Sequence, residues 1–159
     1  MQYITNMIAI IVDTKSYKFD STGMSTGVIY MEIENQFFPD PVWNDFPEVI
    51  LSWWLEGFSQ LLTFKEEGYY EFLFMDGPCK WVVDYSGNEI IQINCYRYDK
   101  IEHSTHEKLS NVIKVLRSVA NDFLRFCNEN HFENEDLKTL EKNFKKLQLK
   151  NKQLNRTKK

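Results

Sequence analysis

The sequence of 159 residues is poor in cysteine and lacks both a close cysteine pair and a long apolar run. Cys79, Cys95 and Cys127 are odd in number and widely separated, which excludes the usual zinc-ligand spacing and the disulfide framework of a small secreted protein. No apolar run is long enough to span a bilayer, and the N-terminus shows neither a basic leader nor a small-residue cleavage site. We therefore expect a cytoplasmic protein with reduced thiols and no membrane partner.

Sequence signatures of known catalytic sites are also missing. The chain has no GxSxG elbow, no Walker phosphate loop, no dinucleotide glycine fingerprint and no kinase signature. Its cysteines fall on expected strands or on an apolar helix face, where cysteine behaves as a small hydrophobic residue and not as a nucleophile. We predict a protein that is not an enzyme, with no catalytic residues and no bound cofactor.

His103 and His106 form the cluster with the best claim to a metal ion. They lie three residues apart between Glu102 and Glu107, which would bring imidazoles and a carboxylate together near a helix start. The simpler interpretation is a group of solvated polar residues, because the longer HExxH pattern is missing. We predict no metal ligands, and a small metal-dependent hydrolase remains only the second alternative function.

Residues 37–64, FFPDPVWNDFPEVILSWWLEGFSQLLTF, contain the helix around which we expect the fold to be organised. On a helical projection its apolar residues cover an arc of about 200°, twice the stripe that a surface helix needs. Pro47 suits the first helical position, and Glu48 suits the positive end of the helix dipole. The pattern predicts a central helix covered by a sheet on one side and by another helix on the other. Trp54 should be buried, and Gly57 should allow a close neighbour.

Strand patterns precede and follow this helix. Residues 3–13 and 26–34 are rich in Ile and Val, and we expect them to pair. After the helix, GYYEFLFMD, CKWVVDY and EIIQINCYRYD are joined by the turn sequences DGP and SGN, which predicts an antiparallel meander with one apolar and one mixed face. The expected fold is α+β: an antiparallel sheet of about five strands, in the chain order ββαβββαα, packed on the central helix and on a second, amphipathic helix.

Two further helices are expected after the meander. Residues 105–128 have an apolar arc near 180°, and Thr105 or Ser104 could cap this helix. Residues 133–159 predict a basic helix that ends in a frayed LNRTKK and has a narrow apolar seam. The seam consists of Leu137, Leu140, Phe144, Leu147 and Leu154. It fits packing on the body or a homodimer through this helix. We expect residues 1–132 to form a single domain that folds without the segment.

Charge is divided unevenly along the chain. Residues 1–137 carry 10 Lys and Arg against 22 Asp and Glu, a net charge of −12. Residues 138–159 carry 9 Lys and Arg against Glu141 alone, a net charge of +8. An acidic body repels nucleic acid phosphates and attracts basic proteins, so we predict a basic protein partner and no nucleic acid partner.

The mixed face of the meander is the candidate binding surface. Most of the 24 aromatic residues should be in the core, but tyrosine, tryptophan and paired charges on a surface are typical of protein-binding hot spots. Five partner-binding residues are predicted on this basis: Asp76, Asp84, Tyr85, Tyr96 and Asp99.

The segment WNDFPEVILSWW, followed by YEFLFMDGP, resembles small uncharacterised Gram-positive bacterial proteins, some of them similar to immunity proteins of polymorphic toxin systems. The resemblance covers about residues 37–80 and carries no catalytic residue. It implies a single-domain inhibitor of a cognate toxin, often a basic nuclease, and electrostatic steering to an acidic body agrees with this. We predict a non-enzymatic protein-binding module of this type. The first alternative is a homo-oligomeric structural or regulatory protein, joined through the C-terminal seam or an exposed strand edge.

Overall fold

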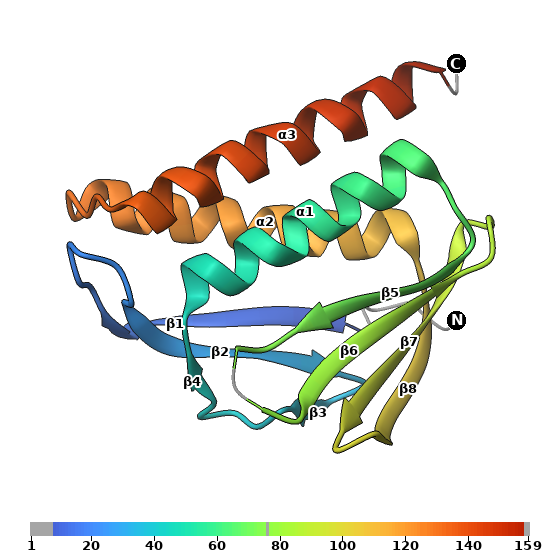
Figure 1. The fold of residues 1–159 in the computed structure, drawn as a ribbon, viewed down its shortest axis with the longest axis horizontal. Coiled ribbons are helices and arrows are strands. Elements are labelled where there is room, and N and C mark those ends of the chain that lie inside the picture. The colour runs from blue at the N-terminus through green and yellow to red at the C-terminus, as the bar shows by residue number, and fades with distance from the viewer. Residues whose placement is uncertain (1–7, 76, 158–159) are drawn as a thin grey trace, which may run out of the picture.

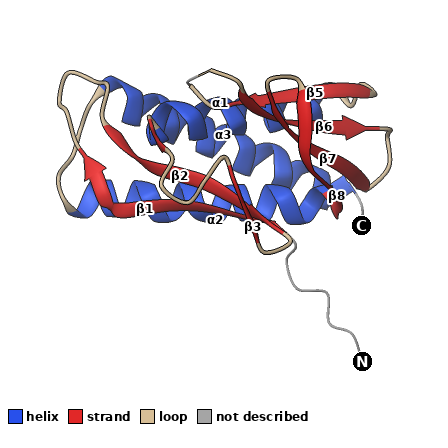
Figure 2. Ribbon diagram, turned by 90° about the horizontal axis from the view of Figure 1, so that it is seen from below, coloured by secondary structure: helices blue, strands red, loops and turns tan. Residues whose placement is uncertain are grey.

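The computed structural model describes residues 8–75 and 77–157 and has an α+β fold, as the sequence predicts (Figure 1). In chain order the elements are β1 (Ile8–Lys18), β2 (Thr26–Ile33), β3 (Gln36–Phe38), β4 (Asn44–Asp45), α1 (Pro47–Phe64), β5 (Gly68–Leu73), β6 (Cys79–Tyr85), β7 (Ile90–Arg97), β8 (Lys100–Lys108), α2 (Leu109–Glu129) and α3 (Glu135–Thr157). Figure 2 shows the strands on one side of the molecule and the helices behind them. The part of the predicted first strand at residues 3–7 lies outside the described residues.

The strands form two antiparallel sheets, whereas we expected one sheet of about five strands. Sheet A has the order β1-β2-β3, with β4 also paired to β2, and sheet B has the order β5-β6-β7-β8. The predicted pairing of the first two strands and the β5-β6-β7 meander are confirmed. Strands β3 and β4 have only three and two residues, too few to leave an alternating pattern in the sequence.

The predicted start of the second helix is wrong, because α2 begins at Leu109 and the residues before it form β8. The buried positions of β8 are Thr105 and Glu107, so the strand lacks the apolar alternation by which a sequence reveals a strand. Thr105 does not cap a helix. Its hydroxyl donates a hydrogen bond of 2.8 Å to Glu34, in the turn between β2 and β3, and thereby ties the two sheets together.

Helix α1 lies between sheet B and α3 (Figure 1). Pro47 occupies its first turn, and the helix ends at Phe64. Lys65 caps this end with a left-handed backbone (φ 52°), and its N–H donates to the Leu61 carbonyl at 2.8 Å. Gly57 faces the sheet, since a Cβ at this position would lie 2.7 Å from the Phe72 ring. The prediction of a central helix covered on two sides is confirmed.

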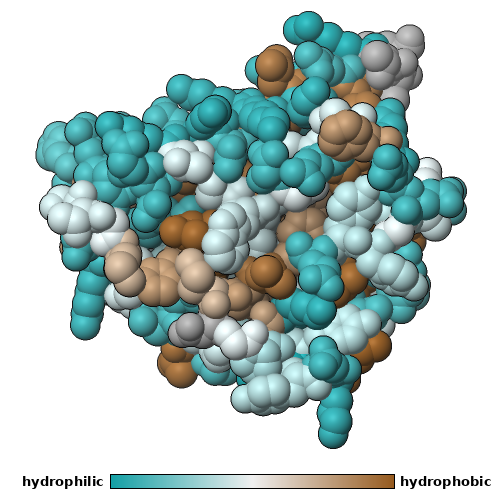
Figure 3. All heavy atoms as spheres, in the orientation of Figure 1, coloured by the Kyte–Doolittle hydropathy of each residue, from teal (hydrophilic) through white to brown (hydrophobic). Residues whose placement is uncertain are grey.

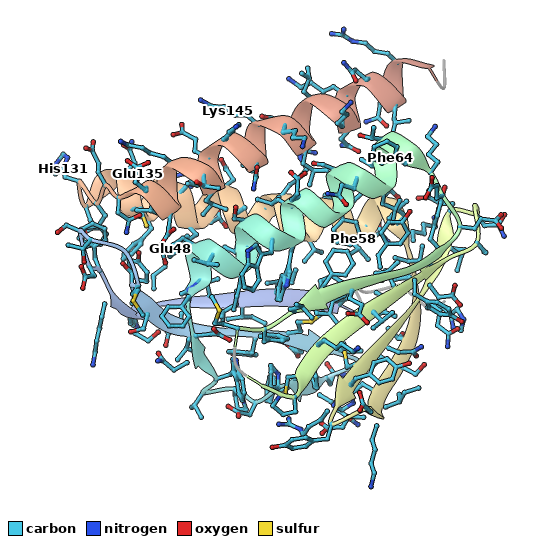
Figure 4. All side chains as sticks on the ribbon, viewed as in Figure 1. Glu48, Phe58, Phe64, His131, Glu135 and Lys145 are labelled. Carbon is cyan, nitrogen blue, oxygen red and sulfur yellow. The ribbon has the colours of Figure 1, made fainter. Side chains whose placement is uncertain are left out.

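Trp54 anchors α1 to sheet B. Its side chain is fully buried, and its indole N–H donates to the Leu73 carbonyl at 2.9 Å. The ring meets Phe74 and Trp81 edge-on, an arrangement that adds about 0.5–1.5 kcal/mol per pair to the effect of burial. Phe58 points from α1 toward the same sheet in Figure 4. The predicted burial of Trp54 is confirmed.

The polar strip of α1 faces α3. The Asn143 side-chain amide donates to the Ser52 hydroxyl at 2.7 Å and to the Ser52 carbonyl at 3.2 Å, and Lys146 pairs with Glu56 at 2.9 Å. These contacts give Ser52 and Glu56 partners on α3, so α1 can bury part of this side as well as its apolar side. The buried Ser59 hydroxyl on the same strip has no hydrogen-bond partner among the described residues. Trp53, at the margin of the apolar arc, is 43% exposed instead.

The seam of α3 packs on its own chain, so the first of the two alternatives is the one observed. Leu137, Leu140 and Leu147 are buried in the same hydrophobic core as the body, and Phe144 and Leu154 pack against that core. Helix α3 continues to Thr157, which makes the first four residues of the expected frayed end helical. The independent folding of residues 1–132 stays a prediction, although burial of the three leucines argues for the opposite outcome.

Candidate protein-binding surface

Sheet B presents one face to α1 and the opposite face, here called the outer face, to the surroundings. Because side chains alternate along a strand, the strand register assigns each residue to a face. The outer face consists of Tyr69, Glu71 and Leu73 on β5, Lys80, Val82 and Asp84 on β6, Gln92, Asn94 and Tyr96 on β7, and Ile101, Ser104 and His106 on β8. Tyr69, Leu73 and Ile101 are 74%, 43% and 54% exposed, whereas Val82 and Asn94 in the middle of this face are buried by their neighbours. The face is therefore open mainly toward its ends and edges.

Polar contacts satisfy the middle of the outer face. The Ser104 hydroxyl donates to the Asn94 side-chain oxygen at 2.5 Å. Lys80 donates to Glu71 at 2.8 Å, and this hydrogen bond raises the pKa of the lysine. The Lys80 ammonium also lies 5.7 Å from the centre of the Tyr96 ring. Lys80 and Tyr96 lie at the same end of the sheet as the exposed Leu73, so this end combines paired polar groups with an exposed apolar one.

Apolar side chains gather where the β5–β6 and β7–β8 connections meet. Tyr98 is 75% exposed in the turn between β7 and β8, beside the exposed Leu73 and Ile101 and the half-buried Tyr96. We call these four residues the tip cluster. A hollow of about 250 Å³ lies at the same end of the sheet and is lined by Leu73, Gly77, Pro78, Cys79, Lys80, Tyr98 and Asp99. Exposed aromatic and aliphatic groups beside a hollow suit a protein contact.

The turn that carries Tyr98 has a backbone conformation that is unfavourable in free energy for residues other than glycine. Tyr98 and Asp99 both adopt left-handed conformations (φ 50° and 65°) in a two-residue hairpin turn, where Asn-Gly is the favoured pair. A left-handed residue other than glycine costs about 1–2 kcal/mol. The Tyr98 N–H donates to the Pro78 carbonyl at 3.1 Å, which holds the turn against the neighbouring connection. The tyrosine is therefore presented from a fixed backbone.

The structure brings some of the predicted site residues together. Tyr96 and Asp99 lie at the tip, with Tyr96 half-buried and Asp99 exposed. Asp84 is half-buried on the outer face, four residues along β6 from Lys80, and lies between Tyr69 and Gln92 on the neighbouring strands. Asp76 lies outside the described residues.

Tyr85 is on the other side of the sheet, which corrects its placement on the mixed face. It shares the alternation of Trp81 and Val83, is only 8% exposed, and belongs to the hydrophobic core. The strand period of two already places Tyr85 with these residues, because 81, 83 and 85 have the same parity. Tyr85 is therefore not a contact residue of the outer face.

Leu73, Lys80 and Ile101 are outer-face residues that the sequence argument did not select. The alternation of β5 and β6 was sufficient to find Leu73 and Lys80, since they share a face with Glu71 and Asp84. Ile101 could not be found in this way, because no strand was predicted after residue 99 and the second half of β8 was assigned to the start of a helix.

The two histidines do not converge on a common site. His103 and His106 lie on β8, where His103 pairs with Cys95 and His106 with Gln92, and these positions are on opposite faces of the sheet. Among the described residues no group of three His, Cys, Asp or Glu side chains could hold a metal ion.

The ionisable groups inside the protein are shifted by burial. All three cysteines are free and buried, and burial raises the pKa of each thiol, to about 12 for Cys127. Glu48 is buried at the start of α1 (Figure 4), where it accepts a hydrogen bond of 2.6 Å from the Tyr17 hydroxyl, and burial raises its pKa. These groups are far too enclosed to form part of the open surface.

No protein-family model, no curated protein and no solved structure matches this chain. None of the described helices is both long and apolar enough to cross a membrane.

Proposed function

We propose that this chain is a non-enzymatic protein-binding module, an immunity-type inhibitor of a basic protein toxin, and that it contacts its partner through the outer face of sheet B. The observation that carries this proposal is the tip cluster, in which the exposed Leu73, Tyr98 and Ile101 and the half-buried Tyr96 gather at one end of the sheet, with Leu73 and Tyr98 lining a hollow. Such side chains supply most of the binding energy in protein interfaces when they fill pockets on the partner.

Preorganisation supports the same surface. A contact residue that is already fixed loses little conformational entropy on binding, and this lowers the cost of association. Tyr98 has a left-handed backbone held by the Pro78 carbonyl, and Tyr96 lies under the Lys80 ammonium. The tip cluster therefore combines exposed side-chain surface with limited conformational freedom.

Charge supports a basic partner. The acidic body carries −12 and the last 22 residues carry +8. Helix α3 lies on the far side of α1 from sheet B (Figure 1), and hydrophilic side chains dominate the surface above it (Figure 3). A basic protein is thus attracted toward the sheets and repelled from α3, so that it meets the outer face in a favourable orientation.

The proposal is tested by affinity capture from the native cell with the wild-type chain and two variants. Tyr98→Ala combined with Ile101→Asp alters the tip, whereas Val42→Asp alters a 75% exposed apolar residue between β3 and β4. We expect a basic protein that wild type and Val42→Asp retain and that the tip variant loses. Co-expression should then restore growth to cells that produce the captured protein.

Two results would count against the proposal. Capture of the same proteins by all three chains would show that the tip is not the contact. Recovery of the chain alone, with a larger size in solution, would favour the homo-oligomer. Packing of the α3 seam on the same chain supports the exposed strand edge over α3 as the route to such an oligomer. The hydrolase alternative is not carried forward, because no observation favours it.

Kinetics separate the two contributions to binding. Asp84→Lys with Asp99→Lys should slow association and leave dissociation nearly unchanged, because charges around a contact act mainly on encounter. Wild-type association should also slow as added salt shortens the Debye length from about 30 Å at 0.01 M to about 10 Å at 0.1 M. Tyr96→Ala should instead speed dissociation.

A further inference from the structure

The outer edge of β1 is a strand edge without the usual protection. Among the described strands β1 pairs with β2 alone, so its other edge has free backbone groups. Proteins commonly protect such edges with charges, prolines or bulges. In β1 the irregular register and the charged Asp13, Lys15 and Lys18 all lie in the second half, and residues 8–12, IAIIV, have regular register and no charge.

A groove runs along this unprotected half. It has a volume of about 450 Å³, with β1 as one wall and α2 as the other. Its lining comprises Ala9, Ile10, Ile11, Val12, Thr14, Asn111, Lys114, Val115, Ser118, Val119, Asp122 and Phe123. Figure 2 shows β1 and α2 side by side at the margin of the molecule. The apolar floor is formed by side chains one helical turn apart, Val115, Val119 and Phe123, and polar residues form the rim.

We infer that this groove binds an extended peptide segment of another protein, which adds to sheet A as a strand beside β1. Backbone hydrogen bonds to the β1 edge would supply affinity, and alternate side chains would point to the apolar floor on α2. This site is separate from the outer face of sheet B and does not depend on the function proposed for that face.

The groove favours a single strand over a second copy of this chain. Helix α2 flanks the edge, and pairing β1 with the β1 of another copy would bring a second α2 into the same narrow space. A lone peptide strand has no such helix. Edge addition to residues 8–12 also requires only a short segment, because a strand rises about 3.3 Å per residue.

Charges at the rim set the charge pattern of a peptide that adds antiparallel to β1. The Tyr17 ring packs against Phe123 at 5.0 Å and Phe126 at 6.2 Å, so β1 and α2 run in the same direction. An antiparallel peptide would place its C-terminal end near Lys114 and its N-terminal end near Asp122, whose ion pair with Arg125 is exposed and 3.5 Å long. The preferred segment is therefore basic at its start, apolar at alternate positions and acidic at its end.

The probe is the synthetic peptide Lys-Val-Thr-Val-Thr-Val-Glu, titrated into the full chain by calorimetry and followed by amide hydrogen exchange. We expect binding that slows exchange at alternate amides of residues 8–12. Two N-methylated forms provide the control: one is methylated at the second and fourth residues, the other at the third and fifth. Only one set of N–H groups can face β1, so one form should bind at least about tenfold more weakly than the other.

A matched pair of variants locates the site. Ser118→Trp fills the groove from an exposed position, whereas Asn121→Trp places the same side chain on the side of α2 that faces α3. Ser118→Trp should weaken peptide binding at least about tenfold and Asn121→Trp by less than about twofold, with equal melting temperatures. Absence of binding by the unmethylated peptide, equal loss with both methylated forms, or an unaffected Ser118→Trp would each overturn the inference.

Discussion

The two faces of sheet B are made by the same four strands, yet they differ in every property that matters for function. The inner face places Phe72, Trp81 and Val83 under α1, and these side chains are almost fully buried. The outer face mixes a satisfied polar centre with the exposed tip cluster. Alternation along a strand separates two sets of side chains, but the helices decide which set becomes core. Covered residues should therefore act on stability and open residues on binding.

Removal of α3 should have the largest effect on stability, because α3 covers the side of α1 that faces away from sheet B. Truncation after Phe132 deletes Leu137, Leu140 and Leu147, which together contribute about 5–9 kcal/mol by burial. A domain has only about 5–15 kcal/mol of total stability. We expect the truncated chain to lose cooperative urea unfolding and near-ultraviolet circular dichroism. A cooperative transition with the wild-type midpoint would instead establish residues 1–132 as an independent domain.

Adjacent tryptophans on α1 offer the next test. Trp54→Ala removes a fully buried ring and its hydrogen bond to Leu73, and should lower the free energy of unfolding by about 3–5 kcal/mol. Trp53→Ala removes a 43% exposed ring from the same helix and should cost less than about 1.5 kcal/mol. Chemical denaturation of both variants measures the difference. Equal midpoints would mean that α1 is not oriented as described.

Glu48 introduces a pH dependence that originates on the covered side. Burial raises its pKa above the ordinary value of 4.5, and its Oε1 atom has no hydrogen-bond partner among the described residues. A raised folded-state pKa stabilises the fold below the unfolded pKa, and this contribution is lost as pH rises through the folded value. Wild type should thus lose stability as pH increases from about 4.5.

Glu48→Gln tests this dependence, because glutamine keeps the shape and the bond from Tyr17 but does not ionise. The stability of the variant should change less with pH than that of wild type. Above the folded-state pKa of Glu48 the variant should be the more stable of the two. Melting temperatures across the pH range measure both profiles. Parallel profiles would show that the carboxyl is hydrated in solution and not buried.

Elements with apolar buried side chains could be predicted from the sequence, and elements with polar buried side chains could not. The central helix, the burial of Trp54 and the β5-β6-β7 meander were predictable, because their buried positions repeat with the period of a helix or strand. Strand β8 was missed because Thr105 and Glu107 are its buried residues. The packing of α3 was left open because its narrow apolar seam fits either the body or a second chain, and part of the surface that it meets on α1 is polar, at Ser52.

The candidate surface was predicted in part. Tyr96 lies on the outer face and Asp99 in the turn beside it, so both are on the predicted side of the sheet or at its end, and their role in binding stays a prediction. Tyr85 lies on the inner face, as its position two residues after Val83 already indicated. Ile101 depended on a strand that the sequence hid. The outer face is formed by residues from four strands, so failure to predict one strand omits every residue that this strand contributes to the surface.

Asp99→Gly should have a smaller and opposite effect on stability. Glycine adopts the left-handed backbone of this position (φ 65°) without steric cost, and Gly is favoured at the second place of this turn. We expect the free energy of unfolding to rise by about 1 kcal/mol. The same change removes one acidic group, so association with a basic partner should slow. A destabilised variant would mean that the aspartate side chain holds the turn.

Tyr98→Ala should have the smallest effect on folding and completes the contrast between the faces. Alanine has the same left-handed backbone cost as tyrosine, so the variant isolates the loss of a 75% exposed ring. Its free energy of unfolding should stay within about 0.5 kcal/mol of wild type. If the ring fills a pocket on the partner, dissociation should speed by at least about tenfold while association changes little. Tyr69→Ala, a 74% exposed tyrosine at the other end of the outer face, is the matched control. Dissociation that is faster than wild type by the same factor in both variants would place the contact across the whole outer face. Wild-type dissociation rates for both variants would remove sheet B from the interface.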